Sequence, residues 1–260
     1  MTYCVGILVR AGLVMVADTR TNAGIDNISI YKKLHALADD DERTIFAATA
    51  GSLSVTQSMI SHLAEGLPAN DDSGIPRLVA AQPSMFRVAQ MVGEALSMSR
   101  TAIGVALEGT RINARASCLV AGRVCGQPLA LYQVYAEGNF IECQPDSPYL
   151  QIGELKYGKP ILDRALTYET SLEEAVKDAL ISFDATMRSN LSVGRPLDLI
   201  AIPSDTTKAP IRLRLADDDA YFDALSRGWG EALNTARDGI PDPPFMTPSV
   251  KHEAAEVQVS

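Results

Sequence analysis

Residues 2–18 read TYCVGILVRAGLVMVAD, and this stretch decides which fold we expect. Residues 3–9 alternate between two faces, and Arg10-Ala11-Gly12 then offers a tight turn into a second apolar run at residues 13–17. The pattern predicts a buried β-hairpin that starts directly after Thr2 and ends at Asp18. Such a hairpin brings Thr2 and Asp18 to the same end of a sheet.

The rest of the chain alternates between blocks of strands and pairs of helices. Strand patterns recur at residues 34–38, 44–48, 112–120, 129–135, 140–143, 197–203 and 211–215. Helical spacing recurs at residues 55–66, 85–96, 159–166, 171–187 and 222–233. This order favours two antiparallel sheets face to face, with helices on both outer faces.

We therefore predict an α+β fold, a four-layer αββα sandwich. No Pro/Ser-rich linker and no repeat interrupts the pattern, so we expect one domain over residues 2–240. Residues 241–260 begin with the proline-rich stretch PDPP and then show no pattern, which predicts a flexible tail.

The composition argues against several classes of function. The 260 residues include 23 basic and 32 acidic ones, a net charge of −9 without clusters of Lys and Arg, so we expect no nucleic-acid partner. No apolar run approaches the ~20 residues of a membrane span, and no basic secretory segment opens the chain. Three histidines without partner motifs argue against Ser-His-Asp or Cys-His catalysis. Four cysteines without a C-x-x-C pair predict reduced thiols in the cytoplasm, with neither metal nor cofactor.

Thr2 is the candidate nucleophile. The small side chain of Thr2 permits removal of Met1 by an aminopeptidase, which would leave a free α-amine on Thr2. Such an amine titrates at about pH 7.7–8.0 and can accept a proton under physiological conditions. One residue then holds both a nucleophile and its base. Asp18 at the end of the returning strand, and Lys33 at the start of the next one, are candidates to lie beside it.

Each of these residues also has a structural interpretation. Asp18 alone could be a turn carboxylate that caps local N–H groups. Lys33 could be a solvated lysine at a strand edge, and a register shift of one residue would exchange it for Lys32. Taken together with Thr2 and Gly51, the functional interpretation is favoured.

Several runs of sequence resemble the proteasome-type peptidases of the N-terminal-nucleophile hydrolase superfamily, and within them the Anbu (ancestral β-subunit) family. The resembling runs are TYCVG at residues 2–6, ADTRTNAG at 17–24, KLH at 33–35, ATAGS at 48–52, IGELKYGKPILD at 152–163 and MRSN at 187–190. In order, these runs are specific, and the resemblance spans residues 2 to about 214.

The resemblance implies roles for the candidate residues. Thr2 Oγ1 would attack an amide carbonyl, and the α-amine of Thr2 would take up the proton and return it to the leaving amine. Lys33 would be the cation beside Thr2, and Asp18 would orient it and keep it charged. The backbone N–H of Gly51 would donate to the oxyanion.

The resemblance implies roles for two further residues, and at one position this sequence differs from the usual family sequence. The resemblance implies that Asp184 is a second carboxylate that supports the N-terminus, with Ser189 or Ser192 as a nearby serine. The family usually has a serine directly after the glycine that corresponds to Gly153, whereas Glu154 occupies that position here. This departure puts the details of the proton relay in doubt.

The resemblance favours a self-assembling threonine-type endopeptidase or amidohydrolase that acts on peptide or protein amides. It implies a homo-oligomer, either a ring or an open helical array, without a cofactor. Two alternatives remain: a non-catalytic scaffold subunit that retained the fold, and an amidase with a narrow set of substrates.

Overall fold

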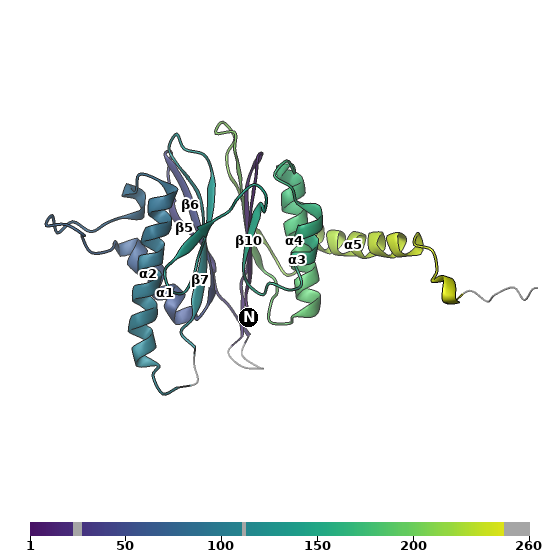
Figure 1. The fold of residues 1–260 in the computed structure, drawn as a ribbon, viewed down its shortest axis with the longest axis horizontal. Coiled ribbons are helices and arrows are strands. Elements are labelled where there is room, and N and C mark those ends of the chain that lie inside the picture. The colour runs from purple at the N-terminus through teal and green to yellow at the C-terminus, as the bar shows by residue number, and fades with distance from the viewer. Residues whose placement is uncertain (23–27, 111–112, 247–260) are drawn as a thin grey trace, which may run out of the picture.

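Four layers of secondary structure lie side by side in the computed structural model, which describes residues 1–22, 28–110 and 113–246 (Figure 1). Helices α1 (Leu53–Glu65) and α2 (Met85–Ala106) cover the outer face of one sheet. Helices α3 (Lys159–Ala165) and α4 (Leu172–Ser189) cover the outer face of the other. The predicted αββα sandwich is confirmed.

The hairpin that decides the fold forms the middle of the first sheet. Strand β1 (Tyr3–Val9) pairs antiparallel with β2 (Gly12–Asp18), with Cys4 opposite Ala17 and Val9 opposite Gly12. The sheet is completed by β10 (Tyr149–Gly153) on the β1 side and by β11 (Leu197–Pro203) and β12 (Ile211–Leu215) on the β2 side. Both ends of the predicted hairpin therefore lie where the sequence pattern put them.

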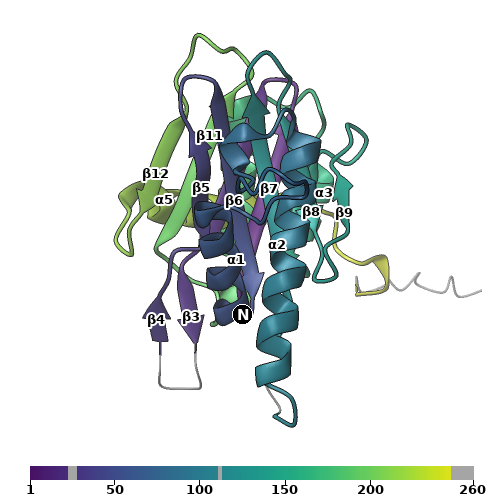
Figure 2. The same ribbon diagram turned by 90° about the vertical axis from the view of Figure 1, so that its left-hand side faces the viewer.

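The second sheet has the order β5-β6-β7-β8-β9. Its strands are β5 (Leu34–Asp39), β6 (Arg43–Gly51), β7 (Ala116–Val124), β8 (Ala130–Val134) and β9 (Phe140–Glu142). The pattern predicted these strands. For the one predicted at residues 112–120, residue 112 lies outside the described residues and the observed strand β7 begins later, at Ala116. A small additional pair, β3 (Arg20–Asn22) and β4 (Ile28–Ile30), lies near the N-terminus (Figure 2). Its strands are too short to give a periodic signal.

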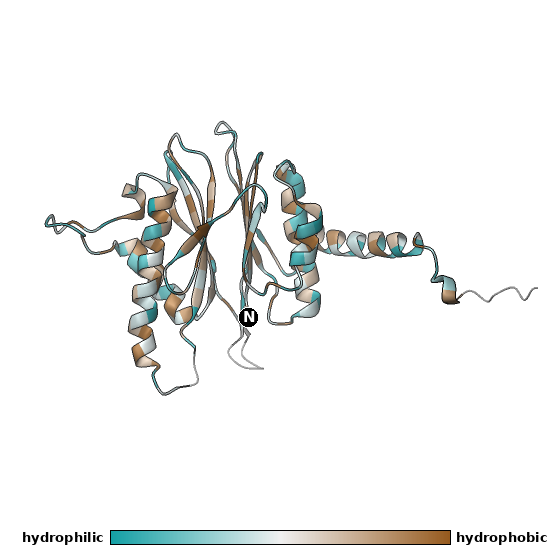
Figure 3. Cartoon of the chain, viewed as in Figure 1, coloured by the Kyte–Doolittle hydropathy of each residue, from teal (hydrophilic) through white to brown (hydrophobic). Residues whose placement is uncertain are grey.

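Buried apolar residues form clusters between the layers. Figure 3 shows hydrophobic residues along the strands of both sheets. Alternation along β1 sends Tyr3, Val5 and Ile7 into a cluster with α4, while Cys4 joins the cluster between the sheets. That inter-sheet cluster includes Leu119 of β7 and Leu131 of β8. The core therefore fixes which way every residue at the ends of these strands points.

Helix α5 (Ala220–Asp238) projects away from the four layers (Figures 1 and 3). Only Phe222 among its residues is buried. A short 3₁₀ turn, η2 (Pro244–Met246), follows. Residues 247–260 of the predicted flexible tail lie outside the described residues. No helix in the described ranges is both long and apolar enough to cross a membrane.

Candidate active site

Thr2 lies directly before β1 and is held by the end of β10. The backbone N–H of Glu154 donates to Thr2 O over 2.7 Å. Gly153 has a φ of 87°, and a Cβ at this position would lie 2.0 Å from Thr2 O. Only glycine allows the backbones of residues 153 and 2 to lie this close without strain. Gly153 therefore helps to fix the position of the Thr2 backbone.

Asp18 and Lys33 form a buried ion pair at the same end of the sandwich. Lys33 Nζ donates to Asp18 Oδ1 over 2.9 Å and to Arg20 O over 2.6 Å. Asp18 Oδ1 also accepts the backbone N–H of Tyr3 over 3.0 Å, which ties the pair to the residue after Thr2. Lys33 is 4 % exposed, whereas Lys32 is exposed. The strand phase therefore places Lys33, and not Lys32, at this site.

The carboxyl group of Asp18 experiences two opposing influences. Burial raises its pKa, and the charge of Lys33, together with the hydrogen bonds from Lys33 and Tyr3, opposes the increase. Cys4 lies close to the same pair, and burial raises the pKa of its thiol well above the ordinary value. Cys4 is therefore a neutral thiol rather than a competing nucleophile.

Gly51 ends β6 with its N–H directed away from β7. The N–H of Ser52 donates to Arg115 O over 2.9 Å, so the alternation of an antiparallel ladder turns the N–H of Gly51 toward the opposite edge. Strand β5 lies on that side of β6. Its first residue, Leu34, pairs with Ala48, so no residue of β5 lies opposite Gly51. Gly51 also has a φ of 104°, and a Cβ here would lie 2.4 Å from Arg115 O. A backbone donor is thus left at the end of β6.

These residues meet at one pocket of about 280 Å³, which we call the Thr2 pocket. It is lined by Met1, Thr2, Thr21, Lys33, Thr49, Ala50, Gly51, Leu53, Thr56 and Gly153. The Thr2 hydroxyl, the buried cation of Lys33 and the backbone of Gly51 thus border one space. This combination can carry out acyl transfer.

The phenol of Tyr3 anchors the strand that carries Thr2, and the sequence analysis missed this contact. Tyr3 OH accepts from Gln151 Nε2 over 2.6 Å and lies 3.0 Å from Ser182 Oγ. Because Ser182 Oγ already donates to Ala179 O over 2.6 Å, Tyr3 OH must be the donor to Ser182. A Cβ at Gly158 would lie 2.4 Å from Tyr3 OH. Gln151 and Gly158 therefore hold the phenol of Tyr3 in place, but no sequence pattern links these two residues to Tyr3.

The structure does not bring Asp184 and Ser189 to Thr2. Asp184 Oδ1 accepts from Ser226 Oγ of α5 over 2.7 Å, and Asp184 Oδ2 pairs with Arg188 over 3.0 Å. Ser189 is exposed at the end of α4, and Ser192 donates its backbone N–H to Asn190. None of these three residues lines the Thr2 pocket. Asp184 instead joins α4 to α5.

Glu154 turns its side chain away from the chain start. Glu154 is buried; its Oε2 accepts from Asn190 Nδ2 over 2.9 Å and its Oε1 from the backbone N–H of Lys156 over 3.1 Å. Its hydrogen bond to Thr2 comes from the backbone N–H. In this chain Glu154 therefore closes a loop against the end of α4 and adds no hydroxyl to the site.

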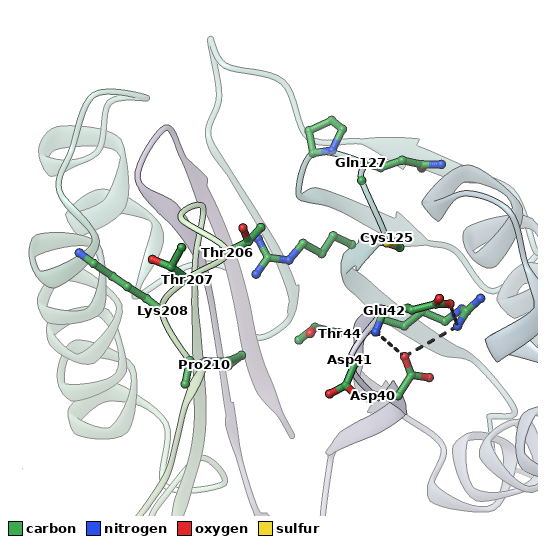
Figure 4. A pocket seen from close by; sticks show the side chains of 15 residues that line it. Asp40, Asp41, Glu42, Thr44, Cys125, Gln127, Thr206, Thr207, Lys208 and Pro210 are labelled. Carbon is green, nitrogen blue, oxygen red and sulfur yellow. Dashed lines mark hydrogen bonds and ion pairs between the residues drawn. The ribbon is translucent and has the colours of Figure 1, made fainter.

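A larger pocket than the Thr2 pocket lies elsewhere. It has a volume of about 790 Å³ and is bordered by the turns β5–β6, β7–β8 and β11–β12. Figure 4 shows Thr207 and Lys208 on one side of it, and Asp40, Glu42 and Cys125 on the other. None of the six predicted site residues lines it. Within the described ranges, no group of three or more His, Cys, Asp or Glu residues could hold a metal ion.

Solved structures of Anbu proteins are similar to this chain over nearly its whole length. Anbu (ancestral beta-subunit) from Yersinia bercovieri is 39 % identical, with a TM-score of 0.83 over 93 % of this chain and 98 % of that one. Anbu from Hyphomicrobium sp. strain MC1 is 41 % identical, with a TM-score of 0.82 over 92 % and 98 %. The helical assembly of the Anbu complex from Pseudomonas aeruginosa is 42 % identical, with a TM-score of 0.83 over 93 % and 98 %. No family model and no curated protein matches the chain.

Proposed function

The chain belongs to the Anbu (ancestral β-subunit) family, and on that premise we propose that it is a self-assembling threonine-type amidohydrolase. Its substrates are peptide or protein amides. The nucleophile is Thr2 Oγ1, and the base is the α-amine that removal of Met1 frees. The Thr2 pocket supports this proposal because Met1 and Thr2 both line it.

The reaction proceeds through an acyl-enzyme. The α-amine of Thr2 takes the proton from Oγ1, and Oγ1 attacks the amide carbonyl. The N–H of Gly51 donates to the oxyanion, and the collapse of the tetrahedral intermediate expels the amine, which receives the proton. Water then hydrolyses the ester at Thr2 by the same proton route in reverse and releases the acid. Lys33 favours the deprotonated forms of both the amine and the hydroxyl.

The observation that carries the proposal is the buried ion pair of Lys33 and Asp18, in which Lys33 lines the Thr2 pocket. Burying two charges costs several kcal/mol per ion, and such a pair adds little net stability compared with apolar residues. We infer that the pair serves the reaction and not the stability of the fold. A cation held by a carboxylate beside a hydroxyl favours the deprotonated form of that hydroxyl, which is the nucleophilic form.

The test combines intact mass with covalent labelling. We expect the purified protein to have lost the mass of Met1 and to form one adduct at Thr2 with an electrophile directed at N-terminal threonine, such as a peptide epoxyketone. Thr2→Ala should abolish the adduct, and Thr2→Ser should retain it. A protein that keeps Met1 and still hydrolyses amides would overturn the mechanism, since the free amine would then sit on the wrong residue.

A second candidate is a non-catalytic assembly subunit that retained the fold. It is favoured by Glu154, which points to Asn190, and by Asp184, which is bonded to Ser226. In that case neither carboxylate serves the proton relay. A protein that begins at Thr2 yet gives no adduct at high dose of the electrophile would select this candidate. An adduct without turnover of a peptide library would instead select an amidase with narrow substrates.

We further propose that copies of this chain associate into a ring or an open helical array in the cytoplasm. The Pseudomonas aeruginosa relative supports this, because it is described as a helical assembly. The projecting helix α5 offers a surface for such contacts. Sedimentation velocity of the purified protein tests the proposal.

A further inference from the structure

A second pocket, of about 440 Å³, adjoins the candidate active site. It shares Ala50, Gly51 and Gly153 with the Thr2 pocket. The other residues that line it come from β7, β8, β10 and the segments that flank them. We call it the Arg115 pocket. Because the two pockets meet at Gly51, a substrate that reacts at Thr2 has room to extend into both.

Polar side chains replace apolar ones where the inter-sheet core reaches this pocket. Leu119 of β7 and Leu131 of β8 belong to that core. By the alternation of the strands, Ser117 and Gln133 share the inward face with these leucines, and both line the pocket. The pocket therefore combines these polar side chains with apolar ones such as Ile152 and Leu155, as sites for small ligands commonly do.

Arg115 brings a positive charge to this face. The ladder between β6 and β7 continues one pair further, because Ser52 N–H donates to Arg115 O over 2.9 Å. Arg115 therefore lies on the same face as Ser117. Among the described residues, the guanidinium of Arg115 has neither a hydrogen bond nor an ion pair. The acidic residue of the pocket, Glu137, lies 3.7 Å from Arg100 instead.

We propose that the Arg115 pocket binds one half of the substrate and that Arg115 recognises a carboxylate on that half. A guanidinium pairs with a carboxylate through two parallel hydrogen bonds, which gives both affinity and orientation. Leu155, at the edge of the pocket, is 46 % exposed and offers apolar contact to the same fragment. The substrate is then an amide with an acid group close to the cleaved bond, either a chain-terminal carboxylate or an acidic side chain. The reacting bond rests on the proposed function, whereas the binding of the carboxylate does not.

Binding to the Thr2→Ala protein tests the inference, because this variant cannot form an acyl-enzyme. Fluorescence anisotropy is measured with three dye-labelled peptides: Ala-Ala-Ala with a free carboxylate, its C-terminal amide, and Ala-Asp-Ala amide. We expect at least one of the two acidic peptides to bind about tenfold or more tightly than the neutral amide. The acidic peptide that binds identifies the source of the carboxylate.

Arg115 is tested in the same background. Arg115→Gln should remove the preference for the acidic peptide, and Arg115→Lys should keep part of it. Arg10→Gln is the matched control, because Arg10 is exposed and pairs with Glu169 away from both pockets. An unchanged thermal midpoint establishes that Arg115→Gln is folded.

Three outcomes would overturn the inference: equal affinities for acid and amide, a preference that survives Arg115→Gln, or no binding at millimolar peptide. The proposed function fails separately. If Thr2 is unreactive toward the electrophile while the preference depends on Arg115, the inference stands and the catalytic proposal falls. If Thr2 reacts and the peptides are not distinguished, the reverse holds.

Discussion

Lys33 Nζ lies 2.9 Å from Asp18 Oδ1, and the two side chains are 5 % and 0 % exposed. Asp18 Oδ1 also accepts the N–H of Tyr3, the residue after the proposed nucleophile. A single carboxylate oxygen therefore connects the cation of the site to the strand that carries Thr2. Removing the negative charge of this carboxylate should disturb the fold and the reaction together.

Asp18→Asn should destabilise the protein by about 3–5 kcal/mol, because it leaves the charge of Lys33 buried without a counter-charge. Labelling of Thr2 should slow by about 100-fold or more, since the cation is no longer held beside it. Urea unfolding and the rate of adduct formation measure the two effects.

Glu169→Gln is the control for Asp18→Asn. It also removes one carboxylate from an ion pair, but Glu169 and Arg10 are 65 % and 68 % exposed, so the loss of stability should be much smaller than for Asp18→Asn. Equal costs for the two variants would show that the buried charge is neutralised by other means.

Gly153→Ala should lower both the stability of the protein and the labelling of Thr2. A Cβ at this position would lie 2.0 Å from Thr2 O and must displace the backbone of Thr2. Gly126→Ala is the matched control, because Gly126 has a φ of 72° but nothing within 4 Å of a built Cβ. The control should cost about 1–2 kcal/mol from backbone strain alone and leave labelling unchanged. Unaltered labelling in Gly153→Ala would contradict the assignment of Thr2.

Stability should fall between pH 6.5 and pH 4 through His35. Burial, reinforced by Lys32 and opposed by Asp198, lowers the pKa of His35 to about 4. The unfolded chain then binds a proton more readily than the folded one, so the contribution is complete above pH 6.5 and is lost as the pH falls. At pH 5 the loss is about 2 kcal/mol.

His35→Gln should remove that part of the pH dependence. The measurement is the difference in unfolding free energy between pH 7.5 and pH 5, which should shrink by about 2 kcal/mol relative to the unmutated chain. His62→Gln serves as the control and should leave the difference as it was. If both variants behave alike, the imidazole of His35 is not the titrating group.

The sequence could predict those parts of the site that follow from short-range pairing. The hairpin of residues 3–18 places Asp18 near Thr2, because its register is set by a short turn and by two apolar faces. The positions of Gly51 and Lys33 can be predicted in the same way from the second hairpin, because the pairing of β5 with β6 brings both to one end of the sheet. The choice between Lys32 and Lys33 needed only the phase of one strand.

Contacts between distant elements could not be predicted in the same way. Asp184 is a residue of α4, and its partners depend on how that helix is rotated against the sheet. Ser182 and Phe183 contact Tyr3, so Asp184 turns to Ser226 on α5 instead. No local pattern records such a rotation, and the resemblance alone suggested a different partner.

Leu233→Lys should weaken self-association without unfolding the protein. Apolar residues recur every four positions along α5 at Leu225, Trp229 and Leu233, and Leu233 is 51 % exposed on the part of the helix that projects from the body. Leu225 packs against the core, whereas the exposed apolar surface at Leu233 is stabilised when a second copy covers it. Thr235→Lys adds the same charge about half a turn around the helix and should leave the assembly intact. Sedimentation velocity compares the variants, and urea unfolding should differ by no more than about 0.5 kcal/mol. If Leu233→Lys sediments like the unmutated protein, the contacts that build the assembly lie on the four layers and not on α5.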